Sequence, residues 1–210
     1  MDNSNTYWEN LSKKITDPGQ TKNKRPDTSD IEIDFLRNYV KQTDDVFDIG
    51  SGTGLIINKL LPFVNHITAV EKFEGFTKHI VEADNMLVIN AEILGFKIRR
   101  KFDIILCTGV AQCFNKADAK KMYQNLFDML DEDGTMIVRM HCGLKEDVIV
   151  NGFSDELNTE YFAEYRKKES EISMLSEIGL SSIEVHDIFP DELNVWDNTR
   201  HFIFVCRKNK

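Results

Sequence analysis

The segment Asp48-Ile49-Gly50-Ser51-Gly52-Thr53-Gly54 carries the strongest structural signal in this 210-residue chain. It ends an apolar run at residues 45–49, which has the length of a buried strand, and it precedes a helical pattern at residues 55–61. Glycine permits a positive φ and leaves no Cβ in the way of a ligand. The first N–H groups of the following helix lack partners within the helix and can bind a polar ligand. We therefore expect a strand, a ligand-binding loop and a helix in this order.

Apolar strands and helical segments alternate on either side of this loop. The expected strands lie at residues 45–49, 66–70, 86–89, 102–107 and 135–140, and the helices between them at residues 55–61, 73–83 and 117–130. Such alternation is typical of a parallel sheet with helices on both faces. A helix at residues 164–178 is followed by strands at 182–189 and 201–206, which must pair antiparallel or diverge. The predicted fold class is α/β, doubly wound, with a mostly parallel seven-stranded sheet and a final antiparallel strand.

The N-terminal residues have a different pattern. Residues 1–16 place Tyr7 and Trp8 on one apolar helical face, and a Pro-Gly break and a polar run follow. This pattern predicts a helix on a linker, which can act as a mobile lid. The chain therefore divides into two parts, residues 1–27 as lid helix and linker, and residues 28–210 as the main domain.

The composition narrows the class of protein. Acidic residues outnumber basic ones by 35 to 26, which gives a net charge of −9 and disfavours nucleic acid as a partner. No apolar run reaches the roughly 20 residues that span a bilayer, and the first residues do not resemble a signal peptide. The four cysteines contain no CxxC pair, as is typical of a reducing compartment. We predict a cytoplasmic protein with no membrane partner.

Glu71, at the end of the second expected strand, adds a second clue, because an acid there can accept both hydroxyls of a ribose. The segment at residues 46–54, with Glu71 downstream, resembles motif I and the following acidic motif of class I S-adenosylmethionine-dependent methyltransferases. The resemblance extends through residues 102–107 and 130–135, and it covers roughly residues 30–208. It implies the Rossmann-like methyltransferase fold and S-adenosylmethionine as the cofactor.

The resemblance also implies a cofactor site at the carboxyl ends of the strands. Asp48 would face the amino group of the cofactor, and Glu71 would hold its ribose hydroxyls. Asn90 stands where the family often has Asp near the adenine, and an amide can still bond the ring edge. The remaining implied positions lie beside these or after the fourth strand: Gly50, Ser51, Gly52, Lys72, Ala91, Thr108 and Gly109.

His141 is the candidate catalytic residue. It follows the fifth expected strand at the edge where the acceptor pocket should open. A neutral hydroxyl acceptor benefits from a general base near pH 7, for which histidine is the natural side chain. The alternative is a structural histidine with its hydrogen bonds satisfied. We expect no metal ion, because no set of Asp, Asn and His residues has the spacing of metal ligands.

Two inserted segments and the N-terminal helix are expected to face the acceptor. The segments at residues 143–165 and 190–200 both leave the ligand edge of the sheet, and their aromatic and charged residues suit a polar small molecule. We predict O-methylation of a sugar or glycan precursor. The alternatives are methylation of protein or RNA, or a regulatory domain that binds the cofactor without turnover. The candidate acceptor-facing residues are Tyr7, Trp8, Tyr161, Trp196 and Arg200.

Overall fold

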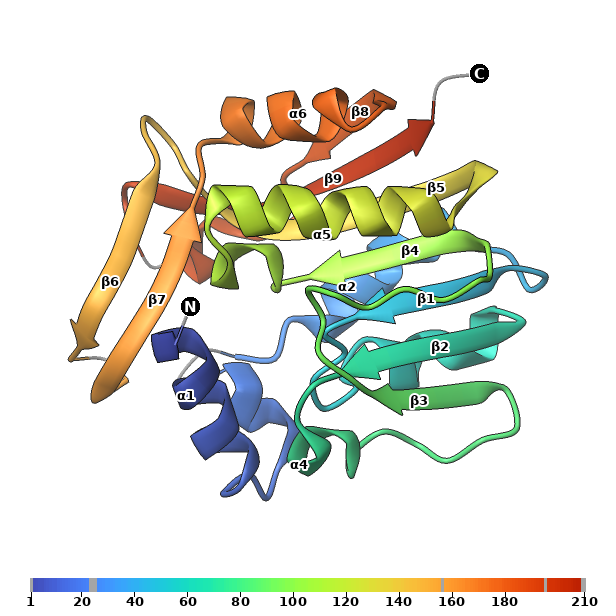
Figure 1. Cartoon of the computed structure of the whole chain (residues 1–210), viewed down its shortest axis with the longest axis horizontal. Helices are drawn as coiled ribbons and strands as arrows, with labels where there is room; N and C mark the ends of the chain where they lie inside the picture. Colours follow the sequence, from blue (N-terminus) through green and yellow to red (C-terminus); the bar gives the residue numbers. More distant parts are fainter. Residues whose placement is uncertain (1, 23–25, 156, 195, 209–210) are drawn as a thin grey trace.

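A seven-stranded sheet forms the centre of the molecule (Figure 1). The computed structural model describes residues 2–22, 26–155, 157–194 and 196–208. The strand order is β3-β2-β1-β4-β5-β9-β8; the first five strands are parallel, and β9 is antiparallel to both of its neighbours. This sheet confirms the predicted fold class. Its strands are β1 (Asp45–Ile49), β2 (His66–Glu71), β3 (Met86–Asn90), β4 (Phe102–Thr108), β5 (Leu130–Gly143), β8 (Leu180–His186) and β9 (Thr199–Lys208).

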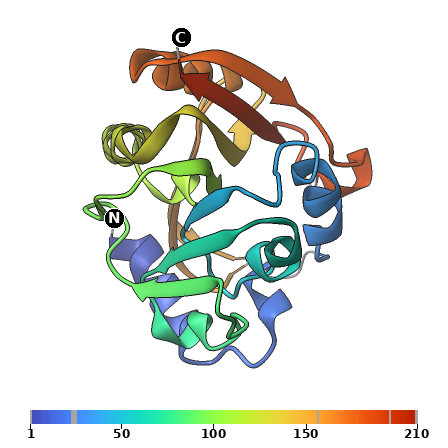
Figure 2. The ribbon, with the colours of Figure 1, turned by 90° about the vertical axis from the view of Figure 1, so that its right-hand side faces the viewer.

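Helices cover both faces of this sheet (Figures 1 and 2). On one face, α5 (Lys116–Met129) and α6 (Lys168–Glu177) bury their apolar side chains against alternate residues of the central strands. On the other face, α2 (Ser29–Leu36) and α3 (Ile57–Leu60) do the same. Each face of the sheet thus has its own hydrophobic core. Because successive strand residues point to opposite faces, the apolar residues of β1 and β4 contribute to both of these cores.

Two segments lie beyond the carboxyl ends of β1, β2 and β4 (Figure 1). One is N-terminal and comprises α1 (Asp2–Ser12) and η1 (Pro18–Lys22); the other is an antiparallel hairpin of β6 (Val148–Ser154) and β7 (Thr159–Tyr165). Tyr7 of α1 packs against Tyr161 of β7, with ring centroids 5.4 Å apart. The two segments therefore meet over the edge where an open α/β sheet binds its ligands. No helix within the described ranges is both long and apolar enough to cross a membrane.

Some expected elements differ from the observed ones. The helix expected at residues 73–83 is only one turn, α4 (Glu74–Thr77), and the inserted segment after β5, to which the sequence assigns no secondary structure, forms the hairpin. The helix expected from residue 164 begins at Lys168, because residues 159–165 continue as β7. In the first part of β7, Tyr161 and Ala163 are buried and alternate with the more exposed Glu160 and Phe162, which is the period of a strand.

Arg166, at the end of β7, is a fully buried arginine that joins several elements. Its Nε donates to Glu171 Oε2 of α6 at 2.7 Å, and its Nη atoms donate to the carbonyls of Ala111 and Phe114 at 3.0 and 3.1 Å. Tyr123 of α5 donates a short hydrogen bond to the other oxygen of Glu171. This pair therefore links the hairpin, both helices of one face and the turn η3 (Ala111–Cys113) that follows β4.

We expect Arg166→Met to lower the free energy of unfolding by about 3–5 kcal/mol, because Glu171 would keep a buried charge without its cation. Arg207→Met is the matched control, because Arg207 forms an exposed ion pair with Glu184. It should cost less than about 1 kcal/mol. Urea unfolding followed by circular dichroism measures both, and equal losses for the two variants would contradict a structural role of the buried pair.

Candidate active site

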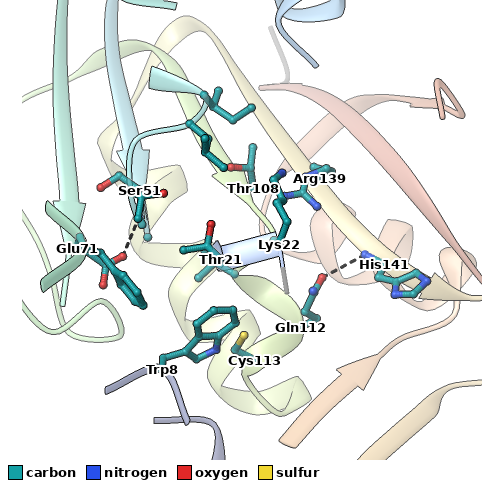
Figure 3. A pocket seen from close by; sticks show the side chains of 18 of the residues that line it. Trp8, Thr21, Lys22, Ser51, Glu71, Thr108, Gln112, Cys113, Arg139 and His141 are labelled. Carbon is teal, nitrogen blue, oxygen red and sulfur yellow. Dashed lines mark hydrogen bonds between the residues drawn. The ribbon is translucent and has the colours of Figure 1, made fainter. Parts of the chain in front are cut away.

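A cavity of about 340 Å³ opens at the carboxyl edge of the sheet, between the glycine loop, the N-terminal segment and the hairpin (Figure 3). Glu71 and Ser51 lie at one end, and Gln112 and His141 lie at the other (Figure 3). The cavity is therefore elongated and has two chemically different ends. We call the end near Glu71 the cofactor end and the end near His141 the acceptor end.

The glycine loop turns sharply at the cofactor end. Gly50, Gly52 and Gly54 have φ values of 70°, 54° and 78°, which side chains with a Cβ rarely adopt. A Cβ on Gly50 would come within 2.4 Å of Val110 Cγ2, whereas a Cβ on Gly52 would meet no atom within 4 Å. The backbone conformation of the loop thus favours glycine at all three positions. At Gly52 there is also open space beside the cavity.

Asp48 lies at the end of β1 with 2% of its surface exposed. Its Oδ1 is buried and accepts no hydrogen bond from the described residues. Burial raises the pKa of Asp48 well above its usual range, and the charges of Glu71 and Glu32 add to this effect. A buried carboxylate without a donor is unfavourable, so a positively charged donor on a ligand would be bound strongly here. The ammonium group of S-adenosylmethionine is such a donor.

Glu71 braces the loop and faces the same end. Its Oε2 accepts from Gly52 N and its Oε1 from Phe73 N, both at 2.9 Å. Burial raises the pKa of Glu71, and the backbone N–H donors partly offset this rise. Each carboxylate oxygen has a second lone pair for a ribose hydroxyl. Beside it, Lys72 Nζ contacts Glu92 at 2.5 Å and Asn5 Oδ1 of α1 at 3.3 Å.

Most residues predicted from the sequence line this cavity, but Tyr7, Asn90, Ala91 and Arg200 do not. Asn90 donates instead to the carbonyl of Glu71 at 3.2 Å, and Ala91 follows it along the edge. Arg200 pairs with Asp187 and Asp191. It points away because the next residue of the strand faces the cavity. The predicted residues in the lining are Trp8, Asp48, Gly50, Ser51, Gly52, Glu71, Lys72, Thr108, Gly109, His141, Tyr161 and Trp196. Tyr7 does not reach the lining but packs against Trp8, with the ring centroids 4.9 Å apart.

The acceptor end is walled by stacked rings. The imidazole of His141 lies 4.2 Å from that of His201 and 5.4 Å from the ring of Trp196, in nearly parallel planes. Tyr165 of the hairpin approaches His141 at 4.7 Å. The backbone N–H of His141 donates to Gln112 Oε1 at 3.2 Å. His141 therefore combines 2% exposure with a position in the cavity wall.

Sequence reasoning missed four acidic or basic residues of the lining: Lys22, Glu92, Arg139 and His201. His201 lies opposite His141 in the antiparallel register of β5 and β9. Arg139 lies two residues before His141, on the same face of β5. The period of two along β5 could have indicated Arg139, whereas Lys22 and His201 reach the cavity only through the tertiary fold. Among the described residues, no group of three or more His, Cys, Asp or Glu is arranged to hold a metal ion.

Comparisons with known proteins agree with this geometry. Residues 47–138 match the family model described as a methyltransferase domain. A structure of DhpI with SAH aligns with 97% of this chain and 94% of that chain, at TM-score 0.72 and 13% identity. The glycopeptide N-methyltransferase MtfA with S-adenosylhomocysteine aligns over 87% and 90%, at TM-score 0.67 and 13% identity. An S-adenosylmethionine-dependent methyltransferase from Clostridium acetobutylicum aligns over 98% of both chains, at TM-score 0.63 and 18% identity. No curated protein sequence matches the chain significantly.

At these identities the solved structures establish the fold, which is the Rossmann-like fold of class I methyltransferases. The family match runs from β1 into β5 and includes the glycine loop and Glu71. The comparisons therefore support an S-adenosylmethionine-dependent methyltransferase, as the sequence predicts. The unpartnered Oδ1 of Asp48 and the open space beside Gly52 both fit this cofactor.

We expect Gly50→Ala to lower the stability of the fold by about 1–2 kcal/mol, since a Cβ there is strained at positive φ. It should also lower the affinity for S-adenosylhomocysteine about tenfold or more, because the displaced Val110 lines the cavity. Gly95→Ala is the control, since its Cβ would meet no atom within 4 Å and its φ is not positive. Calorimetric titration measures the affinity of each variant for S-adenosylhomocysteine. Equal affinities of the two variants would contradict the role assigned to the loop.

Proposed function

We propose that this methyltransferase acts on a hydroxyl group of a polar small molecule, with a sugar or sugar derivative as the acceptor. The observation that carries the proposal is the wall of the acceptor end, where Trp196 and Tyr165 pack against His141, while Tyr161 lines the same cavity. Aromatic faces pack well against the apolar C–H face of a sugar ring, and the polar groups beside them can bond its hydroxyls. The size of the cavity, about 340 Å³, also suits a small acceptor beside the cofactor.

His141 is the proposed general base. A neutral imidazole can accept a proton on a ring nitrogen, and His141 lies in the cavity wall with its ring stacked on that of His201. When bound, S-adenosylmethionine supplies an activated methyl group on a sulfonium sulfur. His141 would take the proton of the acceptor hydroxyl on a ring nitrogen as the methyl group is transferred to the oxygen. The cavity walls hold the two reactants in line, which supplies much of the rate enhancement.

An amine is the second candidate acceptor group. MtfA, one of the structures of similar fold, is a glycopeptide N-methyltransferase. The faces of Trp196 and Tyr165 could hold a protonated amine by cation–π attraction before His141 removes its proton. Protein and RNA are further alternatives, and the small volume of the cavity, about 340 Å³, favours a free small molecule over both.

The N-terminal segment is proposed to act as a lid over the cofactor end. Trp8, Thr21 and Lys22 line the cavity from this segment, and Thr53 of the glycine loop donates to the carbonyl of Pro18 at 3.0 Å. A cofactor that enters or leaves by this side must displace these residues. We further propose that residues 1–27 form the lid and linker, that residues 28–210 form the catalytic domain, and that the enzyme works in the cytoplasm.

We expect the purified protein to transfer a labelled methyl group from S-adenosylmethionine to members of a panel of sugars and nucleotide sugars. His141→Asn should slow turnover about 10²–10⁴-fold and leave the affinity for S-adenosylhomocysteine unchanged. His79→Asn is the control, because His79 does not line the cavity. Transfer only to amines would favour the second candidate. Binding without transfer to any acceptor, protein or RNA would favour a regulatory domain, and a fully active His141 variant would leave that histidine a structural role.

We expect Gly75→Ala to loosen the lid, because a Cβ on Gly75 would come within 2.1 Å of the carbonyl oxygen of Ser12. Relieving this overlap pushes α1 away from α4, so S-adenosylhomocysteine should dissociate about fivefold faster or more. Stopped-flow fluorescence of Trp8 measures the dissociation rate, with Gly95→Ala as the control. An unchanged rate would show that the N-terminal segment does not gate the cofactor.

A further inference from the structure

The hairpin of β6 and β7 has two faces that differ in their surroundings. Val150 of β6 and Tyr161 of β7 line the cavity, and because side chains alternate along a strand, the residues between them point outward. On this outer face, Ile149 and Phe153 are 61% and 59% exposed. In the part of the chain that the structure describes, no other large hydrophobic side chain is as exposed as these two. Exposed apolar side chains gathered on one face of one strand indicate an interaction surface.

The outer edge of β6 is open to a further strand. Among the described residues β6 pairs with β7 alone, and Figure 1 shows it at the margin of the molecule. Its seven residues, Val148–Ser154 with the sequence VIVNGFS, include no charged side chain and no proline. Charged residues and proline are the usual protection of an edge strand against pairing with another chain. The backbone N–H and C=O groups along this edge can therefore bind an added strand.

Acidic side chains stand at both ends of this uncharged strand. Glu146 and Asp147 precede it, Asp155 follows it, and Glu160 of β7 pairs with its next-to-last residue. All four acids are exposed, and within the described ranges none of them forms an ion pair. Residues 143–165 as a whole contain six acidic residues and one basic residue. A partner that binds along this edge is therefore favoured if it brings positive charge.

Charge also separates the possible occupants of the edge. A second copy of the chain would bring the same acids and a further net charge of −9. Antiparallel pairing of two β6 strands about Asn151 would set Asp147 of each copy opposite Asp155 of the other, and like charges opposite each other are destabilising. The same acids would repel an anionic membrane surface. An extended basic peptide, in contrast, satisfies the edge, the apolar side chains and the acids together.

We propose that β6 binds an extended segment of a partner protein as an added strand, and that this segment has an apolar centre with a basic residue at each end. The apolar centre packs on Ile149 and Phe153, and the basic ends face the acids that flank β6. Since Val150 and Tyr161 of the same hairpin line the acceptor end, the partner binds on the back of that wall. The proposal is independent of the identity of the cofactor and of the acceptor.

The test uses three synthetic peptides and fluorescence anisotropy. The first has two lysines, five residues in which valine and threonine alternate, and two more lysines. We expect it to bind with a Kd of about 10–100 μM, as is typical of a small, transient interface. The second has glutamate in place of each lysine and should bind about tenfold more weakly or less. The third has the lysines but is N-methylated at its five central residues, so it cannot pair as a strand and should not bind.

Ile149→Lys and Phe153→Lys place a cation where the apolar centre of the peptide packs. Each should weaken binding of the lysine peptide about tenfold or more. Val81→Lys is the matched control, because Val81 is 42% exposed and lies outside the hairpin, and it should keep the wild-type affinity. Melting curves by circular dichroism show that the variants are folded. Hydrogen exchange locates the peptide, since amides of β6 should exchange more slowly when it is bound.

Several results would overturn the proposal. No binding of the lysine peptide at millimolar concentration would exclude the basic segment, and equal binding of the lysine and glutamate peptides would exclude charge as its basis. Equal binding of the N-methylated peptide, or full affinity of both hairpin variants, would exclude strand addition at β6. A dimer in sedimentation that Phe153→Lys abolishes, with no binding of the peptide, would show that a second copy occupies the edge instead.

Discussion

Buried carboxylates must be matched by hydrogen-bond donors or cations, and several segments of the molecule are joined by contacts that meet this requirement. Glu71 accepts hydrogen bonds from two backbone N–H groups, one of them in the glycine loop. Glu171 accepts hydrogen bonds from Arg166 and from a tyrosine hydroxyl. Glu32 takes two cations. These contacts fix the loop, the hairpin and the N-terminal segment around one cavity. Asp48 is the exception, since its Oδ1 has no donor among the described residues, and that exception marks where a ligand belongs.

The part of the fold that binds the cofactor follows from local sequence. The strand at residues 45–49 has its predicted bounds, and those at residues 66–70, 86–89 and 102–107 gain only one residue each. Buried parallel strands are continuous apolar runs, and here each ends at glycine or a polar residue. Asp48 and Glu71 hold the last or next-to-last positions of such runs. Their place at the ligand edge therefore follows from the parallel topology alone.

The acceptor end depends on contacts between distant segments, which the sequence does not display. Residues 148–154 alternate only weakly in polarity, so the hairpin that carries Tyr161 and Tyr165 has little signal of its own. His201 becomes a cavity residue because the antiparallel register places it opposite His141. Arg200, one residue earlier, points the other way and pairs with acidic residues of its own loop. A shift of one residue in the pairing of β9 with β5 would turn Arg200 toward the cavity and His201 away from it. No local sequence pattern fixes this pairing.

The net charge of −9 disfavours nucleic acid, and it also bears on the reaction itself. S-adenosylmethionine carries a sulfonium, an ammonium and a carboxylate, so it is a cation, whereas its demethylated product is neutral overall. An acidic protein attracts the cation over long range and loses that attraction once the methyl group has moved, although salt weakens the effect. The contact proposed for Asp48 involves only the ammonium group, which both forms share, so it would hold them alike. Discrimination between substrate and product would therefore have to arise near the sulfur, where the two forms differ.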